Sequence, residues 1–584
     1  MIIFAPKFEQ IMIKERLLTN LLTIILAFNT LTASAQDEII EHEGNKYIIN
    51  IEKLNPDSEM TLMDVLHMCP ELISNDGKKI TADYVLSVDD IMLSVDFEPL
   101  LEGIKACDLH QIIVCTYGAV NNAMDGTSGS IDLQFKEGNK DLYGKLALNG
   151  SIYGNGKVYT DITSKSGNFT IRGFAQTNLQ YGKADTPETG ITSRNGSENA
   201  MVFMDWQLTE KDLLKFKLSQ GYGEQKDRLH NSGSIDEMLS RQRWGEIVAT
   251  YERTLNEQEA GLYFETGMHY SNSIVESLKE RNADPWWIAE CSIPFFNQAL
   301  WMTAGYEGGY SNIWYRGVNR EQYLNNDLYV QFDYKKGPWI ITLGDRFRHN
   351  TFWNKPYDKE GESLWSYNRN DHALFASVGY KKEHHFIQGV FNRSYFNPYI
   401  GAFIDLMAEG PTQYNTNYKT HLAWRSELRY TYQAEQIVVT GSATHTLLTD
   451  MPTPNESLIG LGATVTWNKG PLRITGGVNA YHNHYELIES VYDNYFTLKF
   501  APTLLLGRGF RLSSVLLFNS KKKMYDQHAD FYASVKVNKD LGRRCNVFAD
   551  FHDIAGQPDA SPLFLMQSYK NRALTIGITY YPWR

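Results

Sequence analysis

From about residue 142 to its C-terminal end, the chain repeats short segments in which apolar and polar residues alternate. In one of them, Leu328 and Phe332 alternate with Asp327 and Gln331. Successive side chains of a β-strand point to opposite faces, so each segment predicts a strand with one apolar and one polar face. The same alternation recurs in segments 142–152, 262–270, 459–467 and 574–580. Such a chain is restricted to β-structures whose two faces meet different surroundings.

The connections between these segments are alternately short and long. Turns such as Lys165-Ser166-Gly167 are short. The longer polar segments, which we predict to be loops, are 183–197, 224–243, 273–286, 312–326, 353–371, 396–418, 449–456, 486–493, 519–529 and 554–572. Outer-membrane barrels have short periplasmic turns and long outer loops. A soluble sandwich or propeller needs neither this asymmetry nor apolar residues that face outward on nearly every strand.

We therefore predict an all-β transmembrane barrel over residues 139–584. The predicted connections give about 22 antiparallel strands, and an even number leaves the C-terminus on the periplasmic side. Aromatic residues form 13% of the chain, which suits such a barrel. After the N-terminal region, no stretch approaches the roughly 18 apolar residues of a membrane-spanning helix. The net charge of −12 argues against a nucleic-acid partner.

The first 35 residues have the pattern of a cleavable signal peptide. Lys14 and Arg16 precede an apolar run from Leu17 to Leu31, and Ala33-Ser34-Ala35 supplies small residues for cleavage. We expect the mature chain to begin at Gln36, and Met12 is an alternative start. The pattern predicts an exported protein.

Residues 36–138 carry motifs that resemble those of the plug domains of TonB-dependent receptors. The motifs are Met63-Asp64-Val65-Leu66 with Cys69-Pro70-Glu71-Leu72, Val88-Asp89-Asp90, Asp108-Leu109 with Ile112-Ile113-Val114, Tyr117-Gly118-Ala119, and the run from Gly126 to Leu133. The resemblance is strongest to short-plug outer-membrane barrel proteins of Bacteroidetes-like bacteria. It implies a small α/β plug domain ahead of the barrel.

Within this plug the resemblance implies structural rather than chemical roles for Asp64, Pro70, Asp108, Tyr117, Gly118, Gly126 and Gly129. Asp108 precedes a β-branched run and is placed to cap or turn the element before it. Gly126 and Gly129 permit close backbone packing before the last plug strand.

The resemblance also implies a function and a partner. TonB-dependent receptors import scarce solutes, such as siderophores or glycans, and bind TonB through an N-terminal extended segment. Glu38, Ile39 and Ile40 are the candidate contact in this chain. Pro70-Glu71-Leu72 stands where the plugs have Pro-Gly-Val. The alternative is a non-transporting barrel that acts as an adhesin or holds a surface lipoprotein.

No catalytic, cofactor or metal motif is found in the sequence, so we predict no enzyme activity, no cofactor and no metal. His482 and His484 lie two apart and therefore share one face of a strand, but no third ligand is placed beside them. His384 and His385 fall in a turn. Five cysteines do not form a disulfide framework.

Two predicted loops are rich in aromatic and charged residues that suit a glycan or an anionic chelate. The candidate ligand-binding residues are Trp286, Trp287, Trp314, Tyr315, Arg316, Arg320 and Tyr323. Tryptophan and tyrosine also form girdles where a barrel crosses the membrane surface. We favour the girdle for Trp287 and Trp314, because both lie near predicted strand ends.

Overall fold

The computed structural model describes residues 39–582 except 44–45, 55–59, 61, 67–83, 90, 93–103, 117–128, 137–141, 152–154, 186–189, 232–233, 258, 276–277, 317–318, 357–364, 397–420, 435, 450–455, 487–489, 523–528, 543, 553 and 555–572. The predicted signal peptide therefore lies outside the described residues.

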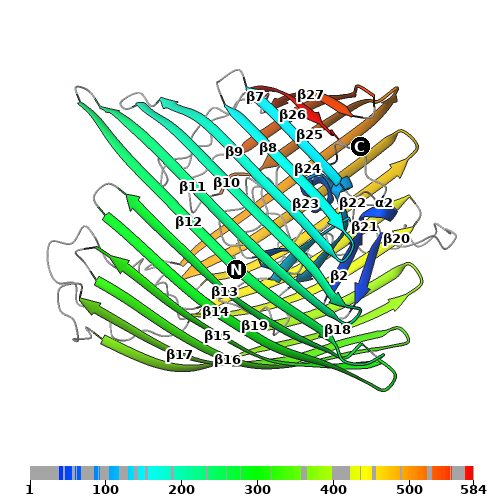
Figure 1. The fold of residues 1–584 in the computed structure, drawn as a ribbon. Helices are drawn as coiled ribbons and strands as arrows, with labels where there is room; N and C mark the ends of the chain where they lie inside the picture. The colour runs from blue at the N-terminus through cyan, green and yellow to red at the C-terminus, as the bar shows by residue number, and fades with distance from the viewer. Residues whose placement is uncertain are drawn as a thin grey trace, which may run out of the picture.

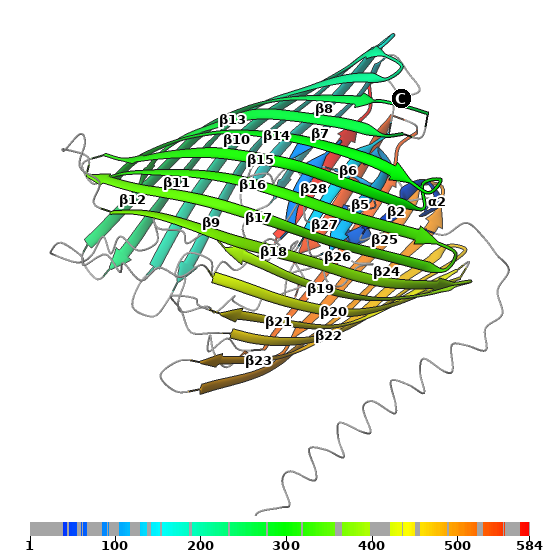
Figure 2. The same cartoon turned by 90° about the horizontal axis from the view of Figure 1, so that it is seen from below.

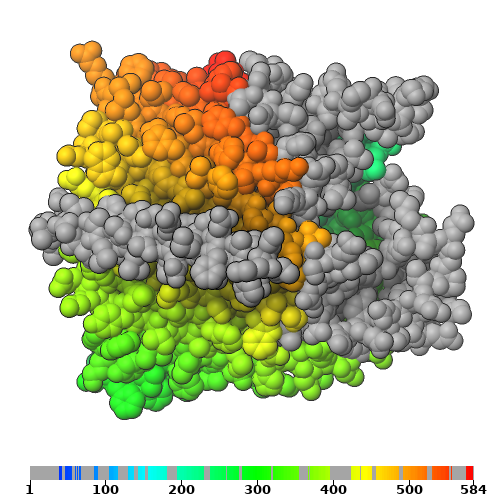
Figure 3. All heavy atoms as spheres, turned by 180° about the vertical axis from the view of Figure 1, so that it is seen from behind, coloured from blue at the N-terminus to red at the C-terminus, as the bar shows by residue number. Residues whose placement is uncertain are grey.

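A closed barrel of 22 strands forms the larger part of the chain (Figure 1), which confirms the predicted strand count. Each strand pairs antiparallel with the next one in the sequence, and β28 pairs with β7 to close the ring. Figure 3 shows one side of the barrel wall, where the colours follow one another in chain order.

The barrel strands are β7 (Leu142–Ser151), β8 (Gly156–Ser166), β9 (Phe169–Asp185), β10 (Gly190–Thr209), β11 (Asp212–Asn231), β12 (Ser234–Thr254), β13 (Gly261–Val275), β14 (Leu278–Phe295), β15 (Leu300–Tyr315), β16 (Asn319–Lys336), β17 (Trp339–Pro356), β18 (Trp365–Lys382), β19 (His385–Phe396), β20 (His421–Ala434), β21 (Ile437–Thr449), β22 (Glu456–Lys469), β23 (Leu472–Glu486), β24 (Ser490–Gly507), β25 (Phe510–Asn519), β26 (Asp530–Asp540), β27 (Cys545–His552) and β28 (Ala573–Tyr580).

The alternation read from the sequence corresponds to the two faces of this wall. On β16, Leu328 and Phe332 are exposed on the outer face, whereas Asp327 and Gln331 are buried on the lumen face. The outer face carries many exposed apolar side chains on successive strands, as a surface in contact with lipid requires. The predicted assignment of faces is confirmed.

The short turns lie where they were predicted, but six of the predicted loops are mostly strand. Segments 183–197, 224–243, 273–286 and 312–326 fall largely within β9 to β16, and segments 353–371 and 486–493 fall mostly within β17, β18, β23 and β24. Strands β10, β11 and β12 have 20, 20 and 21 residues, whereas about 9–11 residues suffice to cross a bilayer. We attribute the error to strand ends that extend beyond the lipid. There both faces meet water, so the hydrogen-bonded ladder continues without an apolar alternation.

The plug forms a separate six-stranded sheet in the order β1-β2-β5-β6-β3-β4. Its elements are β1 (Ile40–Glu43), β2 (Lys46–Asn50), α2 (Ile51–Leu54), α3 (Leu62–Leu66), β3 (Tyr84–Val88), β4 (Ile91–Met92), the 3-10 turn η2 (Ala106–Asp108), β5 (Leu109–Thr116) and β6 (Gly129–Phe135). Among the described plug strands, only β3 and β6 pair in parallel. The predicted small α/β domain is confirmed, and Figure 2 shows its strands inside the ring of barrel strands.

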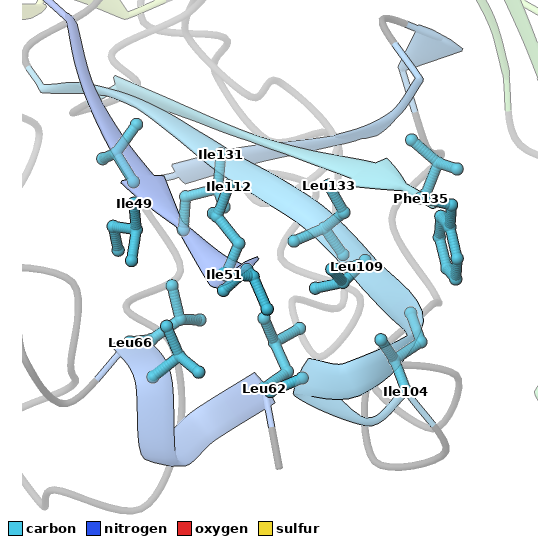
Figure 4. Close-up of a cluster of buried hydrophobic side chains, with 14 of the residues drawn as sticks. Ile49, Ile51, Leu62, Leu66, Ile104, Leu109, Ile112, Ile131, Leu133 and Phe135 are labelled. Carbon is cyan, nitrogen blue, oxygen red and sulfur yellow. The ribbon is translucent and has the colours of Figure 1, made fainter. Parts of the chain in front are cut away.

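One face of the plug sheet packs on its helices (Figure 4). Ile112 and Val114 of β5 and Ile131 and Leu133 of β6 are fully buried there, against apolar residues of α2 and α3. Alternate residues of the same strands face the other way, because strand side chains alternate. In the part of the chain that is described, no helix is long and apolar enough to cross a membrane.

A charge on the outer wall tests whether this face contacts lipid. Leu343 of β17 is 52% exposed and pairs with Phe332, which is also exposed. We expect Leu343→Arg to lower the free energy of unfolding from lipid vesicles by about 2–4 kcal/mol, the cost of a cation near the bilayer midplane. Leu343→Ala is the control for lost packing and should cost less. Equal effects of the two substitutions would contradict a lipid-facing wall.

Candidate functional site

A buried ion pair joins the plug to the first barrel strand. The Lys145 ammonium of β7 lies 2.5 Å from Oδ2 of Asp108, and these side chains are 1% and 5% exposed. The Tyr143 hydroxyl donates to Oδ1 of Asp108 at 3.3 Å, and the Lys105 N–H donates to Oδ2 at 3.1 Å. Burial raises the pKa of Asp108, but the Lys145 charge and the hydrogen bonds from Lys145 and the Lys105 N–H outweigh it, so the pKa is lowered. The carboxylate stays ionised at neutral pH.

A second contact of this kind involves Asp89, in the turn after β3. Its Oδ2 accepts a hydrogen bond from the Arg172 guanidinium of β9 at 3.0 Å, and its Oδ1 accepts the Phe135 N–H at 3.0 Å. The Asp89 carbonyl accepts from Lys215 of β11 at 3.2 Å. Arg172 also lies over the Phe135 ring, 4.3 Å from its centroid. Burial raises the pKa of Asp89 to about 6 despite the Arg172 charge.

The plug is also attached to β20. The Ile40 N–H donates to the Gln433 side-chain oxygen at 2.9 Å in a buried position, and the Arg429 guanidinium lies 4.9 Å from the centroid of the Tyr47 ring. Polar contacts therefore hold the plug to β7, β9 and β11 and also to β20. The sequence analysis named Asp89 only as part of the Val88-Asp89-Asp90 motif and assigned no contact between plug and wall to Asp89, Lys145 or Arg172. The alternation in segment 142–152 did place Lys145 on the polar face of its strand.

The predicted plug residues have separate places in the domain. Asp64 lies in α3, and Asp108 ends η2. Gly129 begins β6, where a Cβ atom would lie 2.0 Å from the Cys115 carbonyl oxygen, so only glycine fits. Pro70, Tyr117, Gly118 and Gly126 lie outside the described residues.

The candidate TonB contact is partly folded into the plug. Ile40 is 4% exposed in β1, an edge strand of the plug sheet, and Ile39 packs against the same core. Glu38 lies outside the described residues. A partner that binds by strand pairing could add to the free edge of β1, but it would have to displace Gln433 from the Ile40 N–H.

The seven candidate ligand-binding residues do not form one site, and the prediction that they lie in loops was wrong. Trp286 and Trp287 lie in β14, Trp314 and Tyr315 in β15, and Arg320 and Tyr323 in β16. Of these seven residues, all of which the structure describes, only Arg316 lies in a turn. The segments are polar because these strand ends extend beyond the part of the barrel wall that contacts lipid, not because they are loops.

These residues also divide between the two faces of the wall. Trp286 faces the lumen and donates to Glu265 at 2.8 Å, whereas Trp287 is exposed on the outer face. Trp314 and Arg320 pair across the outer face, with the guanidinium 5.1 Å from the ring centroid. By the same parity, Tyr315 and Tyr323 face the lumen.

The two histidines that share a face point outward and contact polar neighbours. Both stack on Tyr492, with ring centroids 6.0 Å away for His482 and 4.4 Å away for His484. Nδ1 of His482 lies 2.7 Å from the Asn494 side-chain oxygen. Within the described residues, no three His, Cys, Asp or Glu side chains are placed to hold a metal ion.

A network of buried charges stiffens the wall near mid-barrel. Arg348 donates to both carboxylate oxygens of Asp327, at 2.8 Å from Nε and 2.6 Å from Nη2. Arg346 donates to Asp327 at 2.6 Å and to Glu307 at 2.6 Å. Charge-assisted and bidentate bonds of this kind are the strong ones. Arg346 and Arg348 of β17, which face the lumen, are therefore paired with carboxylates of β15 and β16.

A cavity of about 550 Å³ lies between the plug sheet and the wall formed by β11 to β16. From the plug, it is lined by the face opposite the core, including Ser87, Cys115 and Asp132. From the wall, its lining residues include Glu290 and Tyr329. The cavity also reaches the short turns at the ends of β10 and β12.

A double-mutant cycle tests the Asp108–Lys145 link. We expect Asp108→Asn and Lys145→Met each to cost about 3–5 kcal/mol, because each leaves the other buried group without its partner. The double variant should cost clearly less than the sum of the two. The measurement is the denaturant concentration at which the plug becomes open to pulse proteolysis. Additive costs would show that the two groups do not act as a pair.

The raised pKa of Asp89 predicts a pH-dependent plug. Its folded pKa of about 6 exceeds the ordinary value of 3.8. The native state therefore binds more protons between these values, and stability falls as pH rises from about 4 to about 6. Over this window the wild type should lose up to about 3 kcal/mol relative to Asp89→Asn, and the difference should stay constant above it. Parallel stability curves from pH 4 to 7 would refute this assignment.

Comparison with known proteins places the chain by its fold. No family model matches the sequence, and no curated protein matches it either. The copper transporter OprC superposes with a TM-score of 0.72 at 10% identity, over 92% of this chain and 99% of that one. The FrpB iron transporter from Neisseria meningitidis, F5-1 variant apoprotein, gives 0.68 at 10% identity, over 93% and 100%.

The closed form of the ferric-catecholate import receptor Fiu from E. coli K12 gives a TM-score of 0.69 at 10% identity, over 94% of this chain and 99% of that one. The barrel strands begin only at Leu142, so matches of this extent reach into the plug as well. The chain therefore shares its fold with these three proteins.

Proposed function

We propose that this protein is an importer of the bacterial outer membrane, in which a plug closes a 22-stranded barrel and moves to admit a scarce solute. The observation that carries the proposal is the plug sheet inside the barrel, joined to it by the Asp89 and Asp108 contacts. Barrels of this size enclose a lumen wide enough to need a plug. The apolar outer wall supports the proposed location.

Two further observations support the proposal. The plug motifs resemble those of TonB-dependent receptors, and the structures that share the fold are named as an iron transporter, a copper transporter and a ferric-catecholate import receptor. On this proposal, residues 1–35 are the signal peptide, 36–138 the plug and 139–584 the barrel. TonB would pair with the segment from Glu38 to Ile40 after Gln433 releases the Ile40 N–H.

One observation favours the alternative of a non-transporting barrel that holds a surface lipoprotein or acts as an adhesin. Ile40 is buried in the plug sheet rather than held in an exposed extended segment. A plug that never released β1 would simply close the barrel, and the outer strand ends would be its working surface.

Two measurements test the importer. In planar bilayers we expect a large ion conductance from a variant without residues 36–138 and little from the intact protein, because the plug fills the lumen. In cells, uptake of the transported solute should require both the chain and TonB. The solutes to compare are a ferric siderophore, a copper salt, an oligosaccharide and a polyamine.

The control is a strain that carries the intact chain without TonB. Uptake that persists there would identify a passive channel. If the barrel is present at the surface and none of the four solutes enters faster than in cells without the chain, import is wrong and the scaffold is favoured.

A further inference from the structure

We propose that the outside of strands β12 to β16, just beyond the lipid-facing part of the wall, binds the phosphate groups of a phosphorylated glycolipid in the outer leaflet of the membrane. The site lies on the outside of the barrel, so it would stand even if the barrel carried no solute. It rests on a row of arginines, on their place along the strands and on a contrast with the opposite side of the wall.

The row is made by the register of five neighbouring strands, which lie side by side in the wall (Figure 1). Arg243 of β12, Arg281 of β14 and Arg320 of β16 form it, and we call these three residues the arginine row. Asn272 of β13 and Trp314 of β15 lie between them, each paired with its neighbours on both sides. Adjacent strands are about 4.8 Å apart, so the arginines follow one another at about 10 Å. A ligand with more than one phosphate can contact two of them.

The arginine row faces away from the lumen. On the same three strands, residues of the same parity include Ile247, Trp287 and Leu328, which are 52%, 36% and 58% exposed on the outer wall. Two of the row arginines are exposed, and Arg320 is half-buried beside Trp314. The row therefore continues the face that contacts lipid.

The short turns show how far along the strands the row lies. On β12, Arg243 is 11 positions from Thr254, the last residue of the strand before its short turn. The corresponding separations are 14 positions for Arg281 on β14 and 16 for Arg320 on β16. About 9–11 residues of a tilted strand cross the lipid. The arginine row therefore lies at and beyond the outer end of the lipid-crossing part, where the headgroups are.

Positive charge dominates this part of the outer face. The described outward side chains in the outer halves of β10 to β16, the halves away from the short turns, include eight basic and three acidic residues, namely Arg194, Lys226, Arg228, Arg241, Arg243, Lys279, Arg281 and Arg320 against Glu198, Glu224 and Glu237. Two of the acids already pair with cations outside the arginine row, since Glu224 pairs with Arg241, and Glu237 pairs with Lys226 and Arg228. With every acid compensated, five positive charges remain.

Within the arginine row, aromatic and amide groups hold two guanidinium groups in place. Arg243 lies 5.4 Å from the centroid of the Tyr222 ring, and Arg320 lies 5.1 Å from that of Trp314. Arg320 also donates from Nε to the Asn312 side-chain oxygen at 2.9 Å. Such contacts orient a guanidinium without neutralising it. Its planar set of N–H groups matches the oxygens of a phosphate, which it can bind through two hydrogen bonds at once.

The opposite side of the wall has no comparable row. In the described outer halves of β20 to β26, the outward side chains include His445, His482 and His484 but no lysine or arginine. A general attraction of the rim to anionic headgroups would not need cations on one side only. We therefore expect glycolipid to be held on the side of the arginine row. A lipid is the occupant that the position favours, because the acyl chains contact the wall directly below.

The test compares two glycolipids on the full chain in nanodiscs of zwitterionic lipid. One is lipid A with its phosphates, and the other is dephosphorylated lipid A with the same acyl chains. Native mass spectrometry measures how much of each is retained per chain. We expect the phosphorylated form to bind at least tenfold more tightly, with a preference that falls as salt is added. Equal binding of the two forms would overturn the proposal.

Inorganic phosphate distinguishes a lipid site from a site for the free anion. At the concentration of the lipid A it should not compete, because it lacks the acyl chains that contact the wall. If it competes equally, the site binds free phosphate and the glycolipid assignment is wrong.

Substitutions place the site on the arginine row. Arg243→Gln, Arg281→Gln and Arg320→Gln should each weaken the preference for the phosphorylated form about fivefold, and the triple variant should nearly abolish it. The single variants locate the site if the triple variant does not fold. The matched control removes three exposed cations at the short turns, by Lys211→Gln, Lys336→Gln and Lys469→Gln, and should keep the preference of the parent. A parent-like preference in the folded arginine variants, or an equal loss in the control, would refute the assignment.

Discussion

The structure depends on one constraint, which is that every backbone polar group within a lipid bilayer must find its hydrogen-bond partner inside the protein. This chain meets it by pairing β28 with β7, so the barrel has no open edge. Closure forces each strand to present one face to the outside and the other to the lumen. The outer face therefore carries exposed side chains such as Leu343, while the lumen face is free to carry charge.

Charge on the lumen face is then put to two different uses. Lys145 and Arg172 hold plug carboxylates, and Arg346 and Arg348 are bound to carboxylates of neighbouring strands. Both arrangements place cations against acids at short range in buried positions. Around the cavity beside the plug, Glu265 and Glu290 also receive hydrogen bonds from tryptophan and tyrosine. The plug is thus attached at some points of the wall and separated from it by a polar space at another.

The two-residue alternation and the pattern of short and long connections predicted the barrel well, because alternate residues of a strand lie on opposite faces of the wall. The assignment of Leu328 and Asp327 to opposite faces followed from parity alone. Contacts between plug and wall could not be predicted in this way, since Asp108 and Lys145 meet only after the plug has entered the barrel. The aromatic residues from Trp286 to Tyr323 were misplaced for a related reason. A polar segment indicates only that its side chains contact water, and this is true both of loops and of the outer ends of long strands.

The length of strands β10 to β12 has a consequence for how the barrel meets other molecules. On this side the outer rim is a ladder of paired strands that runs almost to the tip, with Asn231 of β11 still paired to Ser234 of β12. A flexible loop loses conformational entropy when it closes on a ligand, and that loss weakens binding. A ladder of hydrogen-bonded strands has already lost this conformational entropy on folding, so binding does not incur the loss again. This part of the rim is therefore a stiff template, whose selectivity depends on fit more than on adaptation.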